Sequence, residues 1–71
     1  MTPAQLLQWQ RQMGVNGKQA AALLGVGESV YRDLTAGVRR TTGAVIEVID
    51  RRTALVCAAL AAGLEEWAPP G

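Results

Sequence analysis

Apolar residues recur at helical spacing along the chain, and caps and glycines mark where helices are expected to begin and end. The first helix is predicted over residues 1–13. Thr2 can cap it, Pro3 suits its first position, and Gln5 completes a capping box. Its apolar face consists of Leu6, Leu7, Trp9 and Met13. Gly14 is expected to end this helix.

A second, shorter helix is predicted from a cap at Asn16 to Leu24. Its apolar face consists of Ala20, Leu23 and Leu24, at spacings of three and four. Ala21 lies beside that face and leaves room for the next helix to cross closely, so a larger side chain would push the two helices apart. Gly25 can take a positive φ and end the helix.

The third helix is predicted over residues 28–36, with Gly37 at its end. It should bury Leu34 together with either Val30 or Tyr31. Its outward side chains are Glu28, Ser29, Arg32 and Asp33. These are hydrogen-bonding groups near a helix N-terminus, where a helix lying in the DNA major groove contacts base edges.

A long last helix is predicted over residues 44–62, because this segment contains neither glycine nor proline. Thr41 or Thr42 can cap it, and Glu47 can pair with Arg51 one turn later. Two shorter helices are the alternative for this segment. Its C-terminal part is apolar nearly all round, so its second face should contact another copy of the chain. The residues expected in this dimer interface are Ile49, Val56, Leu60 and Leu64.

The length of 71 residues predicts one small domain, over residues 1–66, followed by a tail at 67–71. At this size a single hydrophobic core gives marginal stability, which favours a dimer before any motif is considered. No secretory leader or membrane-length apolar run is recognised. The single Cys57 can form no internal disulfide and is expected to be a small buried hydrophobe. We therefore expect a cytoplasmic protein.

The absence of histidine removes several kinds of chemistry. It excludes Ser-His-Asp and Cys-His nucleophile activation, and it excludes zinc sites that are built with histidine. No glycine-rich phosphate loop occurs either, and Glu65 and Glu66 lie beside the tail instead of converging from separate helices. We therefore expect no enzyme, no catalytic residue, no metal or other cofactor, and no small-molecule ligand.

Charge is distributed unevenly, although the net charge of the whole chain is only +1. Residues 1–42 hold five basic and two acidic side chains, a net charge of +3. Residues 43–71 hold two basic and four acidic side chains, a net charge of −2. A positive half that carries the second and third helices would orient the protein on DNA. Random scatter of charge in a short chain is the alternative.

Residues 19–37 resemble the helix-turn-helix of the Cro and lambda-repressor family, in the pattern Q-A-A-x-L-L-G-V-G-E-S-V-Y-R-D-L-x-x-G. The small Ala21, the glycine at Gly25 and the apolar residue at Val26 carry this resemblance. It implies an all-α, lambda-repressor-like bundle of four to five helices with a long C-terminal dimerisation helix. It also implies double-stranded DNA as partner. An ordinary pair of core helices joined by a glycine turn is the alternative.

The resemblance also implies which side chains contact DNA. The base-reading positions fall on Glu28, Ser29, Arg32 and Asp33, and the phosphate-contacting positions on Lys18, Gln19, Thr35, Arg39 and Arg40. Arg39 and Arg40 would clamp the DNA backbone, or one of them would enter a narrowed minor groove. Gly17 replaces a glutamine that touches phosphate in the family, so that contact is lost or moves to the next two residues. Tyr31 replaces an aliphatic residue, so either the core makes room or the phenol reaches a phosphate.

Together these features predict a homodimeric transcriptional repressor, acting on its own gene, that reads an inverted repeat through the major groove. The chain resembles self-limiting regulators of phages and mobile elements, including those found beside anti-CRISPR genes. This resemblance implies a bacterial or phage-infected cell. The alternative is a protein-interaction module, antitoxin-like or adaptor-like, that uses the same fold without reading bases. Arg32, Arg39 and Arg40 discriminate between the two, because an adaptor has no need for them.

Overall fold

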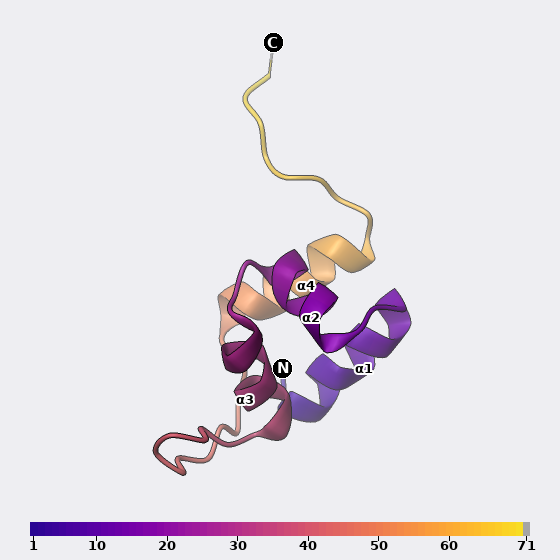
Figure 1. Ribbon diagram of the computed structural model, residues 1–71. Coiled ribbons are helices and arrows are strands. Elements are labelled where there is room, and N and C mark those ends of the chain that lie inside the picture. The colour runs from indigo at the N-terminus through magenta and orange to yellow at the C-terminus, as the bar shows by residue number, and fades with distance from the viewer. Residues whose placement is uncertain (71) are drawn as a thin grey trace.

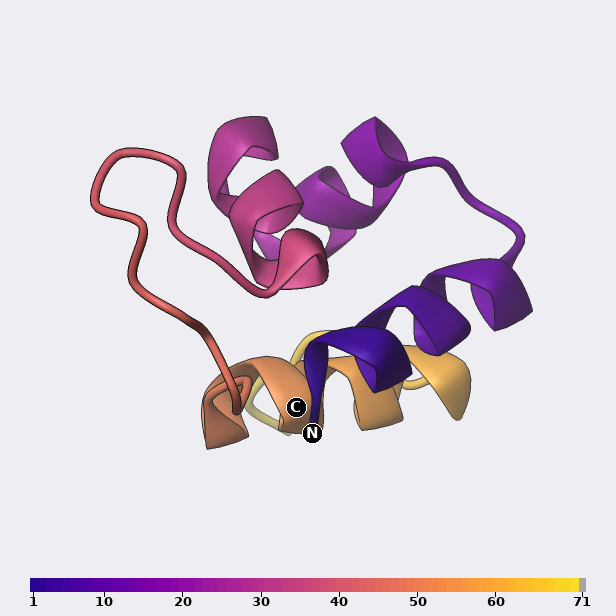
Figure 2. The same ribbon diagram turned by 90° about the horizontal axis from the view of Figure 1, so that it is seen from below.

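The computed structural model describes residues 1–70, which form four helices and no strand within that range (Figure 1). The helices are α1 (Pro3–Met13), α2 (Gly17–Leu24), α3 (Glu28–Ala36) and α4 (Arg51–Ala61). α1 and α4 run side by side, and α2 and α3 form a second layer above them (Figure 2). No helix in the described range is long and apolar enough to cross a membrane. The predicted small, all-helical fold is confirmed.

The caps of the first three helices follow from local sequence. At the start of α1, Gln5 N–H donates to Thr2 Oγ1 at 3.2 Å and Thr2 N–H donates to Gln5 Oε1 at 2.8 Å. Asn16 and Gln19 exchange the same pair of bonds at the start of α2, at 3.0 and 2.8 Å. The three helices end at left-handed glycines, namely Gly14, Gly25 and Gly37, with φ of 68, 71 and 75°. These reciprocal caps and glycine stops explain why the predicted ends agree with the observed ones.

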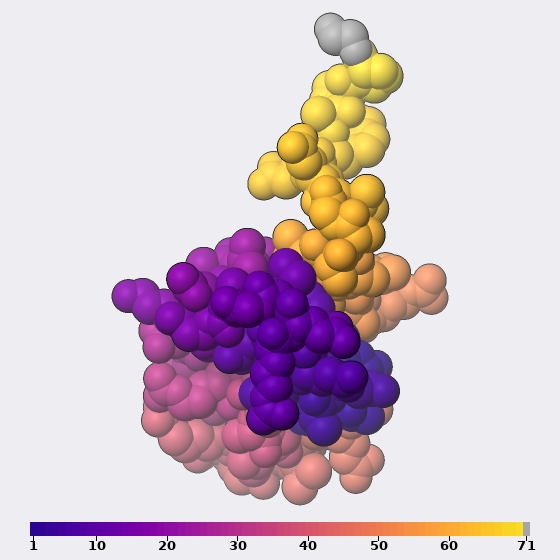
Figure 3. Space-filling model, turned by 90° about the vertical axis from the view of Figure 1, so that its right-hand side faces the viewer, coloured from indigo at the N-terminus to yellow at the C-terminus, as the bar shows by residue number. Residues whose placement is uncertain are grey.

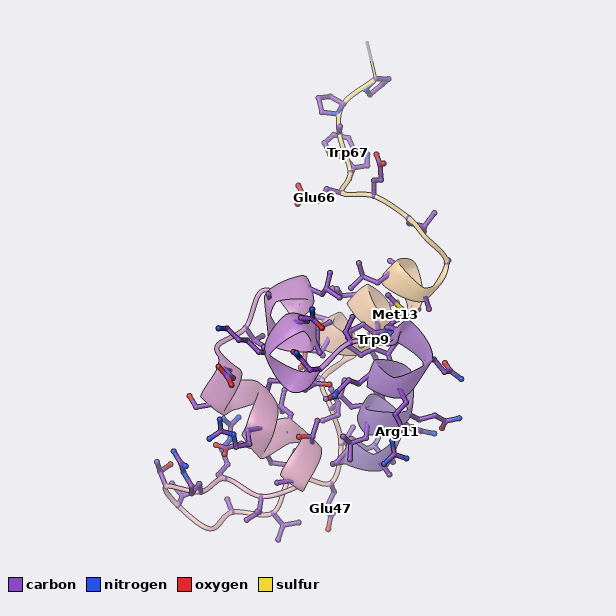
Figure 4. The ribbon with its side chains drawn as sticks, turned by 45° about the vertical axis from the view of Figure 1, so that its right-hand side comes forward. Trp9, Arg11, Met13, Glu47, Glu66 and Trp67 are labelled. Atoms are coloured by element: carbon purple, nitrogen blue, oxygen red, sulfur yellow. The ribbon has the colours of Figure 1, made fainter. Side chains whose placement is uncertain are left out.

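The core draws side chains from all four helices and from the segment before α4. Its buried members are Leu6, Trp9, Ala20, Ala21, Tyr31, Leu34, Ile49 and Cys57. The Trp9 indole N–H donates to the Cys57 carbonyl oxygen at 3.0 Å and so ties α1 to α4. Trp9 is labelled on α1 in Figure 4. Burial raises the pKa of the Cys57 thiol, which therefore stays protonated near neutral pH. Trp9 and Cys57 are the buried core residues that their sequence positions predicted.

Two predictions about packing need correction or completion. Leu23, predicted on the inner face of α2, is 42% exposed, because Ala20 and Ala21 face the core instead. In α3, Tyr31 is the buried partner of Leu34, and Val30 is exposed. The fully buried residues of α2 are therefore two alanines, which lets α3 approach it closely, while Leu24 is partly buried and packs against the core as predicted.

The predicted helix over residues 44–62 is wrong in its first part, because α4 begins only at Arg51. Its N-cap is Asp50, not Thr41 or Thr42. The Thr53 backbone N–H and hydroxyl donate to the Asp50 carboxylate at 3.0 and 2.6 Å and hold the pKa of that carboxyl below its usual value. The preceding residues include the β-branched Val45, Ile46, Val48 and Ile49, which lose side-chain freedom in a helix. The predicted i, i+4 pair of Glu47 with Arg51 is also wrong, since Glu47 lies outside the helix.

Ile49 does not belong to a dimer interface. Its side chain is only 2% exposed within a single copy of the chain, where it is part of the core. Its N–H donates to the Met1 carbonyl oxygen at 2.7 Å, so the segment before α4 is fastened to the start of the chain. The assignment of Ile49 to dimerisation is therefore wrong, because the segment around it packs inward instead of continuing a helix.

The chain leaves the helical body after α4. Residues 64–70 have no regular secondary structure and project away from the body (Figure 3). Trp67 is 84% exposed and contributes nothing to the core. Gly71, the last residue of the predicted tail, lies outside the described residues.

Gly25 offers a test of the turn between α2 and α3. A Cβ at this position would meet no atom within 4 Å, so the cost of a substitution comes from the φ of 71°. Gly25→Val should lower the free energy of unfolding by about 1–2 kcal/mol, the penalty for left-handed backbone. Gly25→Asn should cost less, because asparagine tolerates this region. Urea unfolding followed by circular dichroism measures both, and equal losses for the two variants would contradict this explanation.

Candidate nucleic-acid interface

α3 has one face in the core and the other in solvent. Tyr31 and Leu34 are buried on the inner side and fix the rotation of the helix. Of the side chains predicted to read bases, Glu28, Ser29 and Arg32 are exposed and Asp33 is half-buried. The structure thus brings three of the four together on the solvent side of one helix.

Arg32 forms an ion pair within α3. Its Nη2 lies 3.6 Å from Glu28 Oε1, one helical turn away, and the two side chains are 61% and 53% exposed. An exposed pair of this kind contributes less than about 1 kcal/mol, so Arg32 can leave Glu28 for another acceptor at little cost. No other ion pair occurs among residues 1–70.

The start of α2 has the character of an anion site. The Asn16 side chain accepts only from Gln19 N–H, so the N–H groups of Gly17 and Lys18 have no partner within the described chain. Such free N–H groups, at the positive end of the helix dipole, suit a phosphate. Lys18 is exposed beside them, whereas the Gln19 amide oxygen is already occupied by the cap.

Two hydroxyl groups near this surface have partners inside the protein. The Tyr31 hydroxyl donates to Gln10 Oε1 at 2.9 Å, and its ring is buried. The core has therefore made room for the phenol, which settles the alternative left open by the sequence. The Thr35 hydroxyl lies 3.2 and 3.1 Å from the carbonyl oxygens of Tyr31 and Arg32, so its proton is used by the backbone of α3. A Cβ on Gly17 would lie 4.0 Å from the Tyr31 ring, so the start of α2 lies beside the edge of that ring.

Residues 37–46 form a hairpin that the sequence did not predict. Val38 and Val45 form an antiparallel bridge. Three backbone bonds close the hairpin, from Ile46 N–H to Gly37 O, from Arg39 N–H to Ala44 O and from Gly43 N–H to Arg39 O, at 2.8, 2.8 and 2.7 Å. Both ribbon views show it protruding from the body beside α3 (Figures 1 and 2). The signal that was missed is Gly43, which stands between two β-branched stretches and takes a φ of 71°.

The remaining predicted dimer residues lie elsewhere, between α2 and α4. There a groove of about 470 Å³ opens at the surface, and it is mostly apolar. Its lining residues are Ala22, Leu23, Val56, Ala59, Leu60, Leu64, Glu65 and Glu66. The structure therefore separates the hairpin and the outer face of α3 from the exposed apolar surface of α4.

Tyr31→Phe tests whether the phenol acts inside the protein. Removal of the bond to Gln10 should lower the free energy of unfolding by about 1 kcal/mol. A double-mutant cycle with Gln10→Ala, followed by urea unfolding, should give a coupling energy of the same order. A coupling energy of zero would contradict a stabilising role for this bond.

The burial of Tyr31 also predicts that the folded protein loses stability at alkaline pH. Burial raises the pKa of Tyr31 above its usual value of 10.0, and burial likewise raises the pKa of Cys57 above 9.0. Because the folded state favours the neutral forms, their contribution to stability is complete below pH 9 and is lost as the pH rises through the folded-state pKa values. Unfolding midpoints from pH 7 to 11 should fall above pH 9, and Tyr31→Phe/Cys57→Ala should flatten this decline.

No family model matches the chain, and neither a curated protein nor a solved structure matches it. What these helices do must therefore be inferred from the chemistry of their own side chains.

Proposed function

We propose that the chain is a sequence-specific DNA-binding regulator that uses α2 and α3 as a helix-turn-helix, with α3 in the major groove. The observation that carries this proposal is that α3 has one buried apolar face and one exposed polar face. Tyr31 and Leu34 are buried on its inner face, while Glu28, Ser29 and Arg32 are exposed on the outer face, toward its N-terminus. Arginine can bind the two acceptors of guanine, and serine and glutamate suit other base edges in the major groove.

The surroundings of α3 supply contacts for phosphate. The free N–H groups of Gly17 and Lys18 and the Lys18 ammonium group lie at the start of α2, where an adjacent phosphate would be bound. Arg39 and Arg40, on the hairpin beside α3, add positive charge that no carboxylate neutralises within residues 1–70. Gln19 and Thr35 are weaker candidates for such contacts, because the cap and the α3 backbone already use their polar atoms.

The proposal includes a homodimer formed through the groove between α2 and α4. Val56 and Leu64 are 37% and 63% exposed there, which leaves an apolar surface uncovered in one copy. Arg51 and Arg52 lie at the start of α4, whereas Glu65 and Glu66 follow its end. Two α4 helices packed antiparallel would place the basic end of one against the acidic end of the other. Exposed charges of this kind set orientation more than affinity.

A two-fold dimer would present two copies of α3 and so favour an inverted-repeat site. Such a protein would act as a repressor by occupying DNA, including the DNA upstream of its own gene. The first test is selection of bound duplexes from a random-sequence pool, together with a gel shift on that upstream DNA. Binding without any sequence preference would contradict base reading, and absence of DNA binding would favour an interaction module.

Arg32 and Lys18 should respond differently to substitution. Arg32→Ala should cost roughly 1–3 kcal/mol on the selected duplex and relax preference at one base pair, because a base contact is lost. Lys18→Ala should weaken binding to all sequences about equally. It should also reduce the slope of log K against log salt concentration by about one, because one phosphate contact is lost. Fluorescence anisotropy on selected and random duplexes, over a range of salt concentrations, measures both.

Arg32→Lys is the matched control, since it keeps the charge and loses the guanidinium group, which can bind one base through two hydrogen bonds. It should lose base preference almost as fully as Arg32→Ala. Equal losses on selected and random DNA for either Arg32 variant would remove this residue from base reading.

The dimer can be tested by a charge placed in the groove. Val56→Glu should give monomers, because a carboxylate in this apolar contact would lose its hydration. Those monomers should bind the full site much more weakly, since a single half-site offers fewer phosphate contacts. Leu55→Glu is the control, because Leu55 is 55% exposed and lies outside the groove.

Analytical ultracentrifugation and footprinting decide this prediction together. The wild type and Leu55→Glu should be dimers that protect two half-sites whose centres lie about 34–36 Å apart. A wild-type monomer at concentrations that saturate the selected duplex would overturn the dimer.

A further inference from the structure

The hairpin over residues 37–46 has a shape that phosphate contact alone does not require. Its base is fixed to the body, because Ile46 is half-buried and Ile49 lies in the core. Gly37 ends α3 and also begins the hairpin, and its carbonyl oxygen accepts from Ile46 N–H at 2.8 Å. The position of the hairpin is therefore coupled to that of α3.

The tip of the hairpin is narrow and positively charged. Residues 39–43 are Arg39, Arg40, Thr41, Thr42 and Gly43, all of them exposed. Apart from the two arginines they carry only small side chains, and the tip holds no carboxylate. Neither arginine forms an ion pair within residues 1–70. Val45, on the returning side of the hairpin, is 72% exposed, an apolar side chain that the fold leaves uncovered.

We infer that this hairpin enters the DNA minor groove next to the major-groove segment that α3 contacts, and that it thereby selects A·T base pairs flanking the site. The inference rests on the proposed DNA binding. Narrow minor grooves at A·T runs concentrate negative potential and attract arginine. The guanidinium is less strongly hydrated than an ammonium group, which favours Arg39 and Arg40 over lysine in this confined space. Val45 supplies an apolar side chain of the kind that contacts a minor groove.

The dimensions suit this placement. The nine residues of α3 span about 13 Å at 1.5 Å per residue. The extended segment from Gly37 to Arg39 adds about 7 Å more before the chain turns at residues 40–42. Adjacent major and minor grooves are centred about half a helical turn, or roughly 17 Å, apart. A hairpin that starts at the end of α3 therefore reaches the next minor groove while α3 stays in the major groove.

The experiment varies the base pairs that flank the selected duplex. Three versions carry flanks of A·T, G·C or inosine·C pairs, and fluorescence anisotropy gives the affinity of each. Inosine lacks the guanine N2 amino group in the minor groove but keeps the major-groove acceptors of guanine. We expect the A·T and inosine·C flanks to bind alike and the G·C flank to bind about tenfold more weakly.

The variant Arg39→Lys/Arg40→Lys keeps both charges and should lose this flank preference while it retains the salt dependence of binding. Arg32→Lys is the control, and it should lose preference within the core of the site but keep the flank preference. If inosine·C flanks bind as weakly as G·C flanks, or if the double variant keeps the preference, the minor-groove assignment is overturned. In that case sequence-specific binding of the core would leave the proposed function standing, whereas failure to bind any duplex would overturn both.

Discussion

Tyr31 links three of the four helices, and the candidate interface depends on how it packs. Its ring is buried on the inner face of α3, its hydroxyl donates to Gln10 of α1 at 2.9 Å, and its ring edge lies beside Gly17 at the start of α2. Burial of one such aromatic ring contributes roughly 1.5–3 kcal/mol, a large share of the stability of a small domain. The ring also determines which face of α3 points to solvent, so the packing of the core sets the orientation of the polar face.

The small size of the inner face of α2 complements this ring. Ala20 and Ala21 are fully buried and bring little volume, which leaves space for an aromatic residue on α3. Trp9 fills the other side of the core and binds the Cys57 carbonyl at 3.0 Å, so α4 is fixed to α1. A core of this size holds four short helices in one arrangement but leaves apolar residues of α4 uncovered. The polar face and the apolar groove therefore lie on separate sides of one molecule, as a dimer on DNA would require.

Local sequence determined the first half of the fold. Thr2 and Gln5, then Asn16 and Gln19, bond only to residues three positions away, and each terminating glycine needs only its own φ. These interactions do not depend on distant parts of the chain, so α1, α2 and α3 could be predicted from spacing and caps. The exposed side chains of α3 could be predicted from the same spacing. The spacing could not decide whether Tyr31 or Val30 is buried, because both positions border the inner face.

Tertiary contacts decided the rest. Residues 44–50 contain no helix breaker, yet Ile46 N–H bonds to Gly37 and Ile49 N–H bonds to Met1, partners that are nine and 48 positions away. Sequence spacing cannot reveal such bonds, and once they form, the segment is extended and Ile49 is drawn into the core. The cap formed by Asp50 and Thr53 was the one local signal for a later helix start. The sequence alone therefore determined three helices and their polar face, whereas the hairpin, the start of α4 and the uncovered part of its surface depended on backbone bonds between distant residues.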